Sequence, residues 1–400
     1  MQKIKAKPYN LFGKIQNYEW GTKNEDAFIP KFLGETAELD VPYAEYWIGV
    51  HPKAPSEILI ENQKYNLVDV IKENSNEILG ERIAEKFNNT LPFLLKILSI
   101  NKALSIQAHP DKSLAKLLHT NDPANYPDEN HKPEIAIAID NLKAIVGLKE
   151  FHEIKLTLEN YSEIKNLISD ETLNDLFNSK NSGNNKIIEK LYAQIMNSSK
   201  EKLEKCILQL KKRFESKSDL AECESQFLIQ YENYGSDIGL ISLLLFNMLN
   251  LESGEAIFTP AGIPHAYIKG NIIECMANSD NVVRAGLTPK FKDIKTLTEM
   301  LVVDSQKSEV NIIKNEDRII YKTTAEEFEV SKLNLSNQIK VNDNSEMFIL
   351  IILSGEVKIS FSNSEIIYKK GETVLIPSIL NSFTISGNEK SLVYSVCVPV

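Results

Sequence analysis

The sequence predicts a mainly β protein with an inserted α-helical domain, and it predicts that the strands form two jelly-roll β-barrels. Strand-like segments fill the first 148 residues and the end of the chain, a proline-free helical block separates them, and one strand motif occurs twice. The chain has 400 residues, which is enough for roughly two or three domains.

The strand-like segments are runs of β-branched and aromatic residues between turn formers. Residues 45–52 read EYWIGVHP, and residues 136–148 read AIAIDNLKAIVGL. Such runs are typical of β-strands. Residues 91–100, LPFLLKILSI, are almost uniformly apolar, so periodicity leaves a buried strand and a helix segment both open.

The helical block begins near Lys149 and contains no proline up to about residue 230. Residues 199–217 place Leu203, Ile207 and Leu210 at helical spacing, with Ser199 in front of them as an N-cap. We therefore expect a helical domain over residues 149–235, with its charged faces in solvent. The apolar segment DIGLISLLLFNML, which follows at 237–249, is expected to be a buried helix.

The repeated motif links the two ends of the chain. GEAIFTPAGIPHAY at 254–267 aligns without gaps with GETVLIPSILNSFT at 371–384. Short strands between Gly and Pro turns favour a jelly-roll of the cupin type, present twice. The copies differ where His265 corresponds to Ser382, and no histidine follows His265 in the chain.

These observations predict three domains. A metal-binding cupin domain is expected from residues 1–148 and 236–305, with the helical domain of residues 149–235 inserted between the two segments. Residues 306–400 are expected to form a jelly-roll without metal, since that part of the chain has no histidine.

Composition limits the kinds of binding partner and the cellular location that we expect. A net charge of −10 argues against nucleic acid and against an anionic membrane, although a local group of Lys and Arg still permits an anionic small substrate. The four cysteines form no CxxC pair, so neither a disulfide framework nor a thiolate zinc site is indicated. The start lacks the apolar run of a signal peptide, and the longest apolar stretch is too short to span a bilayer. We expect a cytoplasmic monomer.

Any histidine-based site must be assembled from six histidines. Gln107 and His109, in SIQAHPDK, lie two apart and would share one face of a strand. Glu134, in HKPE, and His265 would complete a set of two imidazoles, one carboxylate and one amide. Such a set suits catalytic zinc, and iron or manganese would also accept it. Taken alone, the Gln–His pair is more typical of a polar strand end than of a metal site.

A second candidate feature is ECMANSDNVVRAGLTPK at 274–290, which is polar and shows few signs of a regular element. Long polar loops often carry function. Arg284 and Lys290 are placed to bind an anionic group or to stabilise developing negative charge. An exposed loop held by salt bridges is the alternative.

Together these motifs resemble type I phosphomannose isomerases. The resemblance rests on YEWG (18–21), AEYWIGVHP (44–52), LPFLLKILSI with ALSIQAHPDK (91–112), HKPE (131–134), GEAIFTPAGIPHAY (254–267) and IECMANSDNVVRAGLTPKFKD (273–293). The motifs occur in the family's order, and the helical block and final jelly-roll also match. The combination is specific, whereas a single motif would not be.

The resemblance implies an enzyme with one zinc ion per chain that interconverts mannose 6-phosphate and fructose 6-phosphate through an enediol. It implies Gln107, His109, Glu134 and His265 as zinc ligands and Arg284 as an active-site residue. Further pocket residues implied in the same way are Lys112, Lys132, Tyr267, Glu274, Asp280 and Lys290.

The remaining roles follow from the chemistry of the reaction. A positioned base is needed, and the candidates are Glu274, Asp280, Lys132 and a zinc-bound hydroxide. Candidates for contacting the sugar phosphate are Ser105, Lys112, Lys290 and Trp20. Two other classes stay open: an iron-dependent cupin oxygenase, which the group of cations disfavours, and a non-catalytic sugar-phosphate-binding protein, which the complete set of candidate ligands disfavours.

Overall fold

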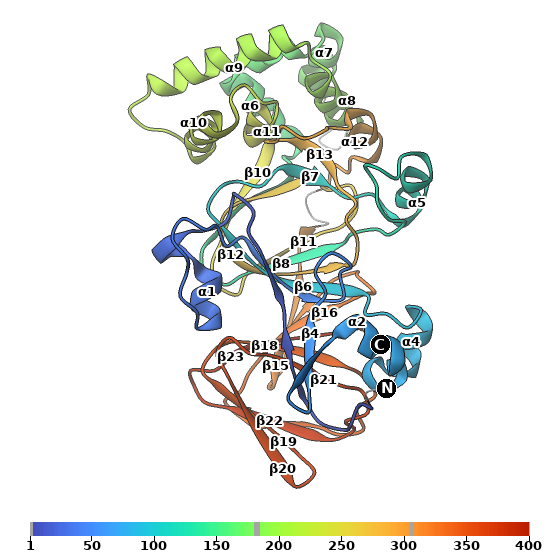
Figure 1. The fold of residues 1–400 in the computed structure, drawn as a ribbon. Helices are drawn as coiled ribbons and strands as arrows, with labels where there is room; N and C mark the ends of the chain where they lie inside the picture. Colours follow the sequence, from blue (N-terminus) through green and yellow to red (C-terminus); the bar gives the residue numbers. More distant parts are fainter. Residues whose placement is uncertain (1–2, 180–184, 305–307, 400) are drawn as a thin grey trace.

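The computed structural model describes residues 3–179, 185–304 and 308–399. Figure 1 shows three tiers: helices at one end, a large β region in the middle, and the C-terminal strands at the other end. The predicted mainly β fold with a helical insertion is confirmed. No helix in the described ranges is long and apolar enough to cross a membrane.

The middle tier is a ten-stranded antiparallel sheet, here called the metal-site sheet. Its strands are β2 (Lys14–Gln16), β3 (Glu45–Gly49), β6 (Phe93–Ile100), β7 (Ile106–Ala108), β8 (Glu134–Ala138), β9 (Leu142–Leu148), β10 (Phe246–Leu251), β11 (Ala256–Thr259), β12 (His265–Ala277) and β13 (Val283–Gly286).

Strand β12 organises this sheet because it pairs along its length with β6, β7, β8 and β9. The run that periodicity left open is strand β6, and all of its residues are buried. Burial on both faces explains why this strand shows no alternation of apolar and polar residues.

The helical tier follows β9 and returns the chain to β10. Its elements are α6 (Phe151–Asn160), the 3-10 helix η2 (Ser162–Leu167), α7 (Asp170–Asn178), α8 (Asn185–Met196), α9 (Lys200–Glu215), α10 (Glu222–Tyr234) and α11 (Gly239–Leu245). Ser199 is the N-cap of α9, as its position predicts.

The helix expected over residues 237–249 is shorter in the structure. Helix α11 ends at Leu245, and the chain continues as β10, which pairs with β9 from Phe246 to Leu251. Apolar composition alone does not distinguish the two elements, because a short apolar run is typical both of a buried helix and of a buried strand.

The third tier contains a nine-stranded and a four-stranded sheet. The strands of this C-terminal β region are β14 (Asn311–Lys314), β15 (Arg318–Lys322), β16 (Glu329–Leu333), β17 (Ile339–Val341), β18 (Phe348–Ser354), β19 (Glu356–Phe361), β20 (Ser364–Lys369), β21 (Thr373–Ile376), β22 (Phe383–Gly387) and β23 (Leu392–Cys397).

Three N-terminal strands join the nine-stranded sheet: β1 (Tyr9–Phe12), β4 (Glu57–Ile60) and β5 (Gln63–Asn66). Strand β1 pairs with β21, with Tyr9 opposite Leu375. The boundary between the sheets therefore does not follow the predicted domain boundary at residue 306, since part of residues 1–148 extends the C-terminal sheet. The assignment of the strands to two closed barrels stays a prediction.

The remaining helices are distributed along the molecule (Figure 1). They are the 3-10 helix η1 (Asn24–Asp26), α1 (Phe28–Leu33), α2 (Leu67–Glu73), α3 (Ser75–Leu79), α4 (Glu81–Lys86), α5 (Lys112–Asn121) and α12 (Ile294–Met300). Helix α12 lies beside α8 of the helical tier. Helix α5 directly follows the histidine motif after β7, and it begins at an Asp111 side chain that accepts a hydrogen bond from Leu114 N at 2.8 Å.

Candidate metal centre

Three strands bring the predicted ligands together. Gln107 lies in β7, and His109 follows at its end, while Glu134 begins β8 and His265 begins β12. Gln107 and His265 face each other in the β7–β12 register, and Gln107 is also paired with Arg284 of β13. Antiparallel pairing thus joins residues that are more than 150 positions apart in the chain.

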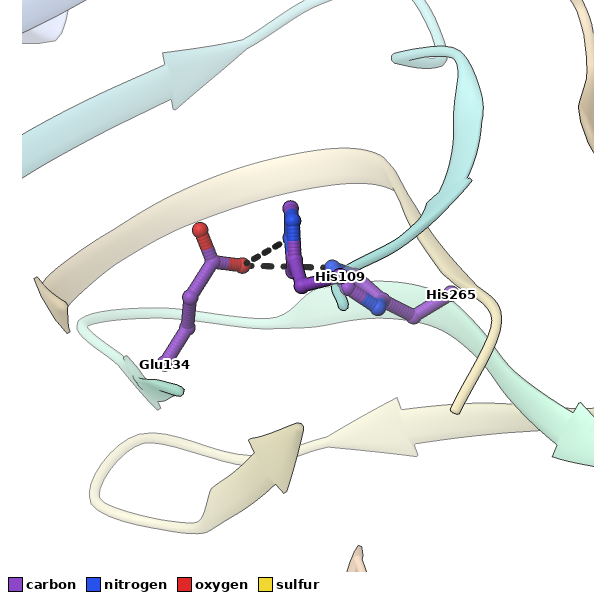
Figure 2. A group of neighbouring side chains, drawn as sticks. All are labelled: His109, Glu134 and His265. Carbon is purple, nitrogen blue, oxygen red and sulfur yellow. Dashed lines mark hydrogen bonds and ion pairs between the residues drawn. The ribbon is translucent and has the colours of Figure 1, made fainter. Parts of the chain in front are cut away.

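His109, Glu134 and His265 form a compact buried group (Figure 2). Their ligand atoms all lie within 4.8 Å of one another. The Glu134 Oε2 atom is 3.3 Å from His109 Nε2 and 3.2 Å from His265 Nε2. This is the arrangement of nitrogen and oxygen donors that a divalent metal requires.

The outer nitrogens of both imidazoles are fixed by backbone carbonyls. His109 Nδ1–H donates to Asn281 O at 2.8 Å, and His265 Nδ1–H donates to Ile263 O at 3.0 Å. Each Nε2 then presents a lone pair toward the Glu134 carboxylate, so acceptors face acceptors in a buried space. His109 Nε2 accordingly has no hydrogen-bond partner among the described residues. A cation bound between these atoms would remove the conflict.

The electrostatics of the group favour the protonation states that a metal needs. Burial lowers the pKa of His109 to about 4, despite the opposing charge of Glu134, so its imidazole is neutral at pH 7. Burial alone would raise the pKa of Glu134, but Lys132 and the two histidines hold that pKa well below its usual value. Lys132 Nζ contacts the other carboxylate oxygen, Glu134 Oε1, at 2.9 Å.

Glu134 and Gln107 line a cavity of about 580 Å³. Ten of the thirteen residues that the sequence singles out line it: Trp20, Ser105, Gln107, Lys132, Glu134, Tyr267, Glu274, Asp280, Arg284 and Lys290. His109 and His265 contact Glu134 but do not belong to the lining, and each is at most 1% exposed.

Lys112 is the exception, because it does not belong to the cavity lining. It is the first residue of α5 and is exposed. Asp111 is the N-cap of this helix, so Lys112 belongs to a different element from Gln107. Its expected contact with substrate stays a prediction.

Lys96 is a cavity residue that the sequence analysis missed. It lies in β6, is 6% exposed, and pairs with Glu274 at 3.0 Å and with Glu45 at 3.5 Å. Trp47 packs beside it, with the ammonium 5.4 Å from the ring centroid. The signal was present in the sequence: Lys96 interrupts an otherwise apolar strand, and a buried lysine needs paired carboxylates.

The two acidic candidates for the base lie in different environments. Burial raises the pKa of Glu274, with Lys96 opposing the shift and Glu134 adding to it. Asp280 instead contacts His51 Nε2 at 3.3 Å and Lys53 Nζ at 2.7 Å, and these partners hold its pKa far below the usual value. Glu274 is thus the more basic carboxylate of the pair.

Tyr267 presents a phenol hydroxyl beside these carboxylates. The group is buried and has no hydrogen-bond partner among the described residues. Burial raises its pKa well above the usual value, and the charges of Glu274 and Glu134 add to the shift. The phenol therefore stays protonated and can donate to an oxygen in the cavity.

Arg284 and Lys290 carry positive charge that is not neutralised by an ion pair in the described part of the chain. Lys53, Lys96 and Lys132, the other lysines of the cavity, each contact a carboxylate. The segment that holds Arg284 is also more regular than expected, since β12 runs to Ala277 and β13 covers Val283–Gly286. Pairing with β7 supplies this order, and the local sequence contains no sign of it.

The β fold with a buried His–Glu–His group is that of a metal-binding protein with cupin architecture. Family models match the chain over three ranges: the catalytic domain of type I phosphomannose isomerase over residues 9–151, its helical insertion domain over 156–246, and the mannose-6-phosphate isomerase cupin domain over 318–396. The chain belongs to the type I phosphomannose isomerase family.

Individual relatives agree with the family models. Mannose-6-phosphate isomerase of Saccharomyces cerevisiae is 40% identical over 354 residues, which cover 81% of this chain and 82% of the relative. The enzyme of Rattus norvegicus is 34% identical, covering 93% and 90%. A crystal structure of mannose 6-phosphate isomerase from Salmonella typhimurium, bound to fructose 6-phosphate and zinc, matches with a TM-score of 0.88 and 29% identity, covering 98% of this chain and 100% of that one.

Proposed function

We propose that this protein is a zinc-dependent isomerase that interconverts mannose 6-phosphate and fructose 6-phosphate by proton transfer between C1 and C2 through an enediol. The observation that carries the proposal is a buried His109–Glu134–His265 group that meets a cavity holding two unpaired cations, Arg284 and Lys290. Family membership and the zinc and fructose 6-phosphate of the solved relative support the same activity.

Zinc would be held by His109, Glu134 and His265, with Gln107 as the fourth ligand. The facing lone pairs of the two Nε2 atoms and the Glu134 carboxylate support this assignment. When bound, zinc supplies Lewis-acid stabilisation of negative charge on the substrate oxygens. We propose one zinc ion per chain.

The sugar phosphate would be recognised by cations that form no ion pair with the residues that the structure describes. A dianion entering the cavity meets Arg284 and Lys290, which need not break an ion pair to bind it. Ser105 and Trp20 line the same cavity and offer a hydroxyl and an aromatic face. This set of charges favours an anionic substrate over the apolar or neutral substrate of an oxygenase.

Glu274 is proposed as the base. A carboxylate with a raised pKa takes up and returns a proton more readily than one held ionised by two cations, as Asp280 is. Lys96 contacts Glu274 at 3.0 Å and would orient it. Tyr267 would donate its hydroxyl hydrogen to a substrate oxygen as negative charge develops.

The test is a coupled assay that follows fructose 6-phosphate formation from mannose 6-phosphate. Protein reconstituted with zinc should turn over, and treatment with a chelator should abolish the activity reversibly. Zinc-loaded protein that binds mannose 6-phosphate without converting it would contradict the proposal and favour a binding protein. Turnover that depends on oxygen and iron would favour the oxygenase alternative.

A further inference from the structure

The turn of residues 278–281 joins β12 to β13 and orients the ring of His109. The Asn281 carbonyl oxygen accepts the hydrogen bond from His109 Nδ1–H at 2.8 Å, so Nε2 faces Glu134. The partner of the outer nitrogen fixes the ring of a metal-ligating histidine. The position of the Asn281 carbonyl therefore sets the position of one proposed ligand.

Asn281 is itself fixed by a second loop, residues 127–131. Its side chain is fully buried, and its amide Nδ2 donates to Asp128 O at 2.7 Å and to Asn130 O at 2.9 Å. This loop leads directly to Lys132 and Glu134. The loop that precedes Glu134 and the turn that precedes Arg284 are thus joined by hydrogen bonds of Asn281.

The carboxylate of Asp128 is the centre of this junction. Its Oδ2 accepts the backbone N–H of Asp280 at 2.8 Å. Its Oδ1 accepts the Ser279 hydroxyl at 2.8 Å and the Asn281 amide at 3.2 Å, together with the backbone N–H of Asn130 at 2.9 Å. Every group that faces this carboxylate is a hydrogen-bond donor, so only an ionised acid satisfies all of them.

The first half of the turn is held by other contacts. Ala277 N donates to Pro133 O at 3.1 Å, and Asn278 N donates to Pro92 O at 3.0 Å. Beyond Asn278, hydrogen bonds to Asp128 and Asn130 connect the turn to the neighbouring loop. Loss of the Asp128 carboxylate would remove its hydrogen bonds with the Ser279 hydroxyl, the Asp280 N–H and the Asn281 amide. The backbone carbonyls of Asp128 and Asn130 would still hold the Asn281 amide, so the turn that bears the Asn281 carbonyl would be loosened rather than released.

We propose that Asp128 is a positioning residue for the metal centre. It contacts neither the three clustered ligands nor the cavity; it fixes the turn whose Asn281 carbonyl aligns His109 Nε2 for the metal. The inference rests on the proposed zinc site and adds a determinant of its affinity. Removal of the Asp128 charge should weaken zinc binding even though every candidate ligand is still present.

The experiment compares zinc dissociation constants by competition with a chromophoric chelator. In Asp128→Asn the new amide places donor hydrogens against Ser279 and Asn281 or against Asp280, whichever way it turns. We expect zinc to bind roughly 10-fold more weakly, with an unchanged circular dichroism spectrum. Activity lost at low zinc should return when zinc is added, which a general folding defect would not allow.

Glu129→Gln is the matched control. It removes the same charge one residue away, at an exposed position, and should leave zinc affinity unchanged. Equal zinc affinity in Asp128→Asn and the wild-type protein would overturn the inference. If Asp128→Asn does not fold, Ser279→Ala replaces it: this variant deletes the hydroxyl that donates to Asp128 and to Asn130 O, and unchanged zinc affinity there would also overturn the inference.

The outcome separates this inference from the proposed function. Wild-type protein that binds no zinc in the competition assay would contradict the proposed function itself. Wild-type protein that binds zinc and isomerises, beside an Asp128→Asn variant of equal zinc affinity, would contradict only the positioning role of Asp128.

Discussion

The metal-site sheet and the C-terminal β region carry the same short motif but differ in what they enclose. After Gly254-Glu255 the chain forms β11 and then reaches His265 at the start of β12; after Gly371-Glu372 it forms β21 and then Ser382, just before β22. His265 is buried beside Glu134. Ser382 is exposed.

The interior of the C-terminal region explains this difference. Between its sheets lies an apolar cluster of Leu333, Leu335, Ile339, Leu350, Ile352, Val357, Ile359, Tyr368, Val374, Ile376, Leu380, Phe383, Ile385 and Val393. The buried polar residues of the region, Glu327, Ser331, Thr373, Ser378 and Ser395 among them, include no imidazole. Apolar burial stabilises a fold, whereas buried imidazoles and carboxylates cost free energy unless they are paired or bind a metal. A similar strand framework therefore serves packing in one region and chemistry in the other.

The largest expected effect is at His265. His265→Ala should abolish zinc binding and lower kcat/KM roughly 10³-fold or more, because one of two imidazole ligands is lost. Zinc content by atomic absorption and the coupled assay measure this. Ser382→Ala, at the equivalent position of the motif, should change neither. A His265→Ala variant with full zinc content would remove this residue from the ligand set.

Glu274→Gln should give the second largest effect. Loss of the proposed base is expected to lower kcat by about 10² to 10⁴ while zinc content stays normal. Asp280→Asn, in the same cavity, provides the comparison and should cost less, since the pKa of Asp280 is held low by His51 and Lys53. An Asp280→Asn loss as large as that of Glu274→Gln would reject the choice between these two carboxylates.

The same comparison shows which residues of the candidate site could be predicted from the sequence. The three clustered ligands belong to motifs with local spacing, and the repeated motif identified His265 by its contrast with Ser382. Lys96 was missed because its partners, Glu45 and Glu274, lie far away in the sequence and are joined to it only through β3–β6 and β6–β12 pairing. Lys112 starts helix α5 and does not belong to the cavity lining, and its contact with substrate stays a prediction.

The division of strands between the sheets differs from the predicted domain limits for a related reason. Strands β1, β4 and β5 come early in the chain but pair with the C-terminal sheet. Nothing local in residues 9–66 specifies which of two apolar sheets they extend, since the choice is made by long-range pairing. Likewise, the order of β13 comes from β7 and not from its own composition.

A stability change in the C-terminal region should leave the chemistry intact. Ile352 of β18 is fully buried in the apolar cluster, and Ile352→Ala should lower the free energy of unfolding by about 2–5 kcal/mol. Denaturant unfolding measures this, and kcat measured well below the unfolding midpoint should not change. Ile367→Ala on β20, where the side chain is 53% exposed, should stay within about 0.5 kcal/mol of the wild type. A matching loss in kcat for Ile352→Ala would show that the two regions are not independent.

The smallest change is expected at one contact between the two regions, the pair of His131 and Glu327. His131 Nε2, three residues before Glu134, lies 2.7 Å from Glu327 Oε1 of the C-terminal region. Burial alone would raise the pKa of Glu327, but His131 lowers it overall, so the carboxylate is ionised above its ordinary pKa of 4.5. A depressed pKa in the folded state contributes stability above pH 4.5, and that contribution is lost as the pH falls further.

Glu327→Gln should therefore reduce the free energy of unfolding by about 1–2 kcal/mol at pH 7, and the difference from the wild type should shrink below pH 4.5. Urea titrations at several pH values measure this change. Zinc content should stay normal, because Glu327 contacts His131 and none of the three clustered residues, and the two clustered histidines are held by backbone carbonyls. If the stability difference between Glu327→Gln and the wild type did not depend on pH, packing and not the charge of Glu327 would stabilise the contact. A fall in zinc affinity would mean that the C-terminal region also helps to position Glu134.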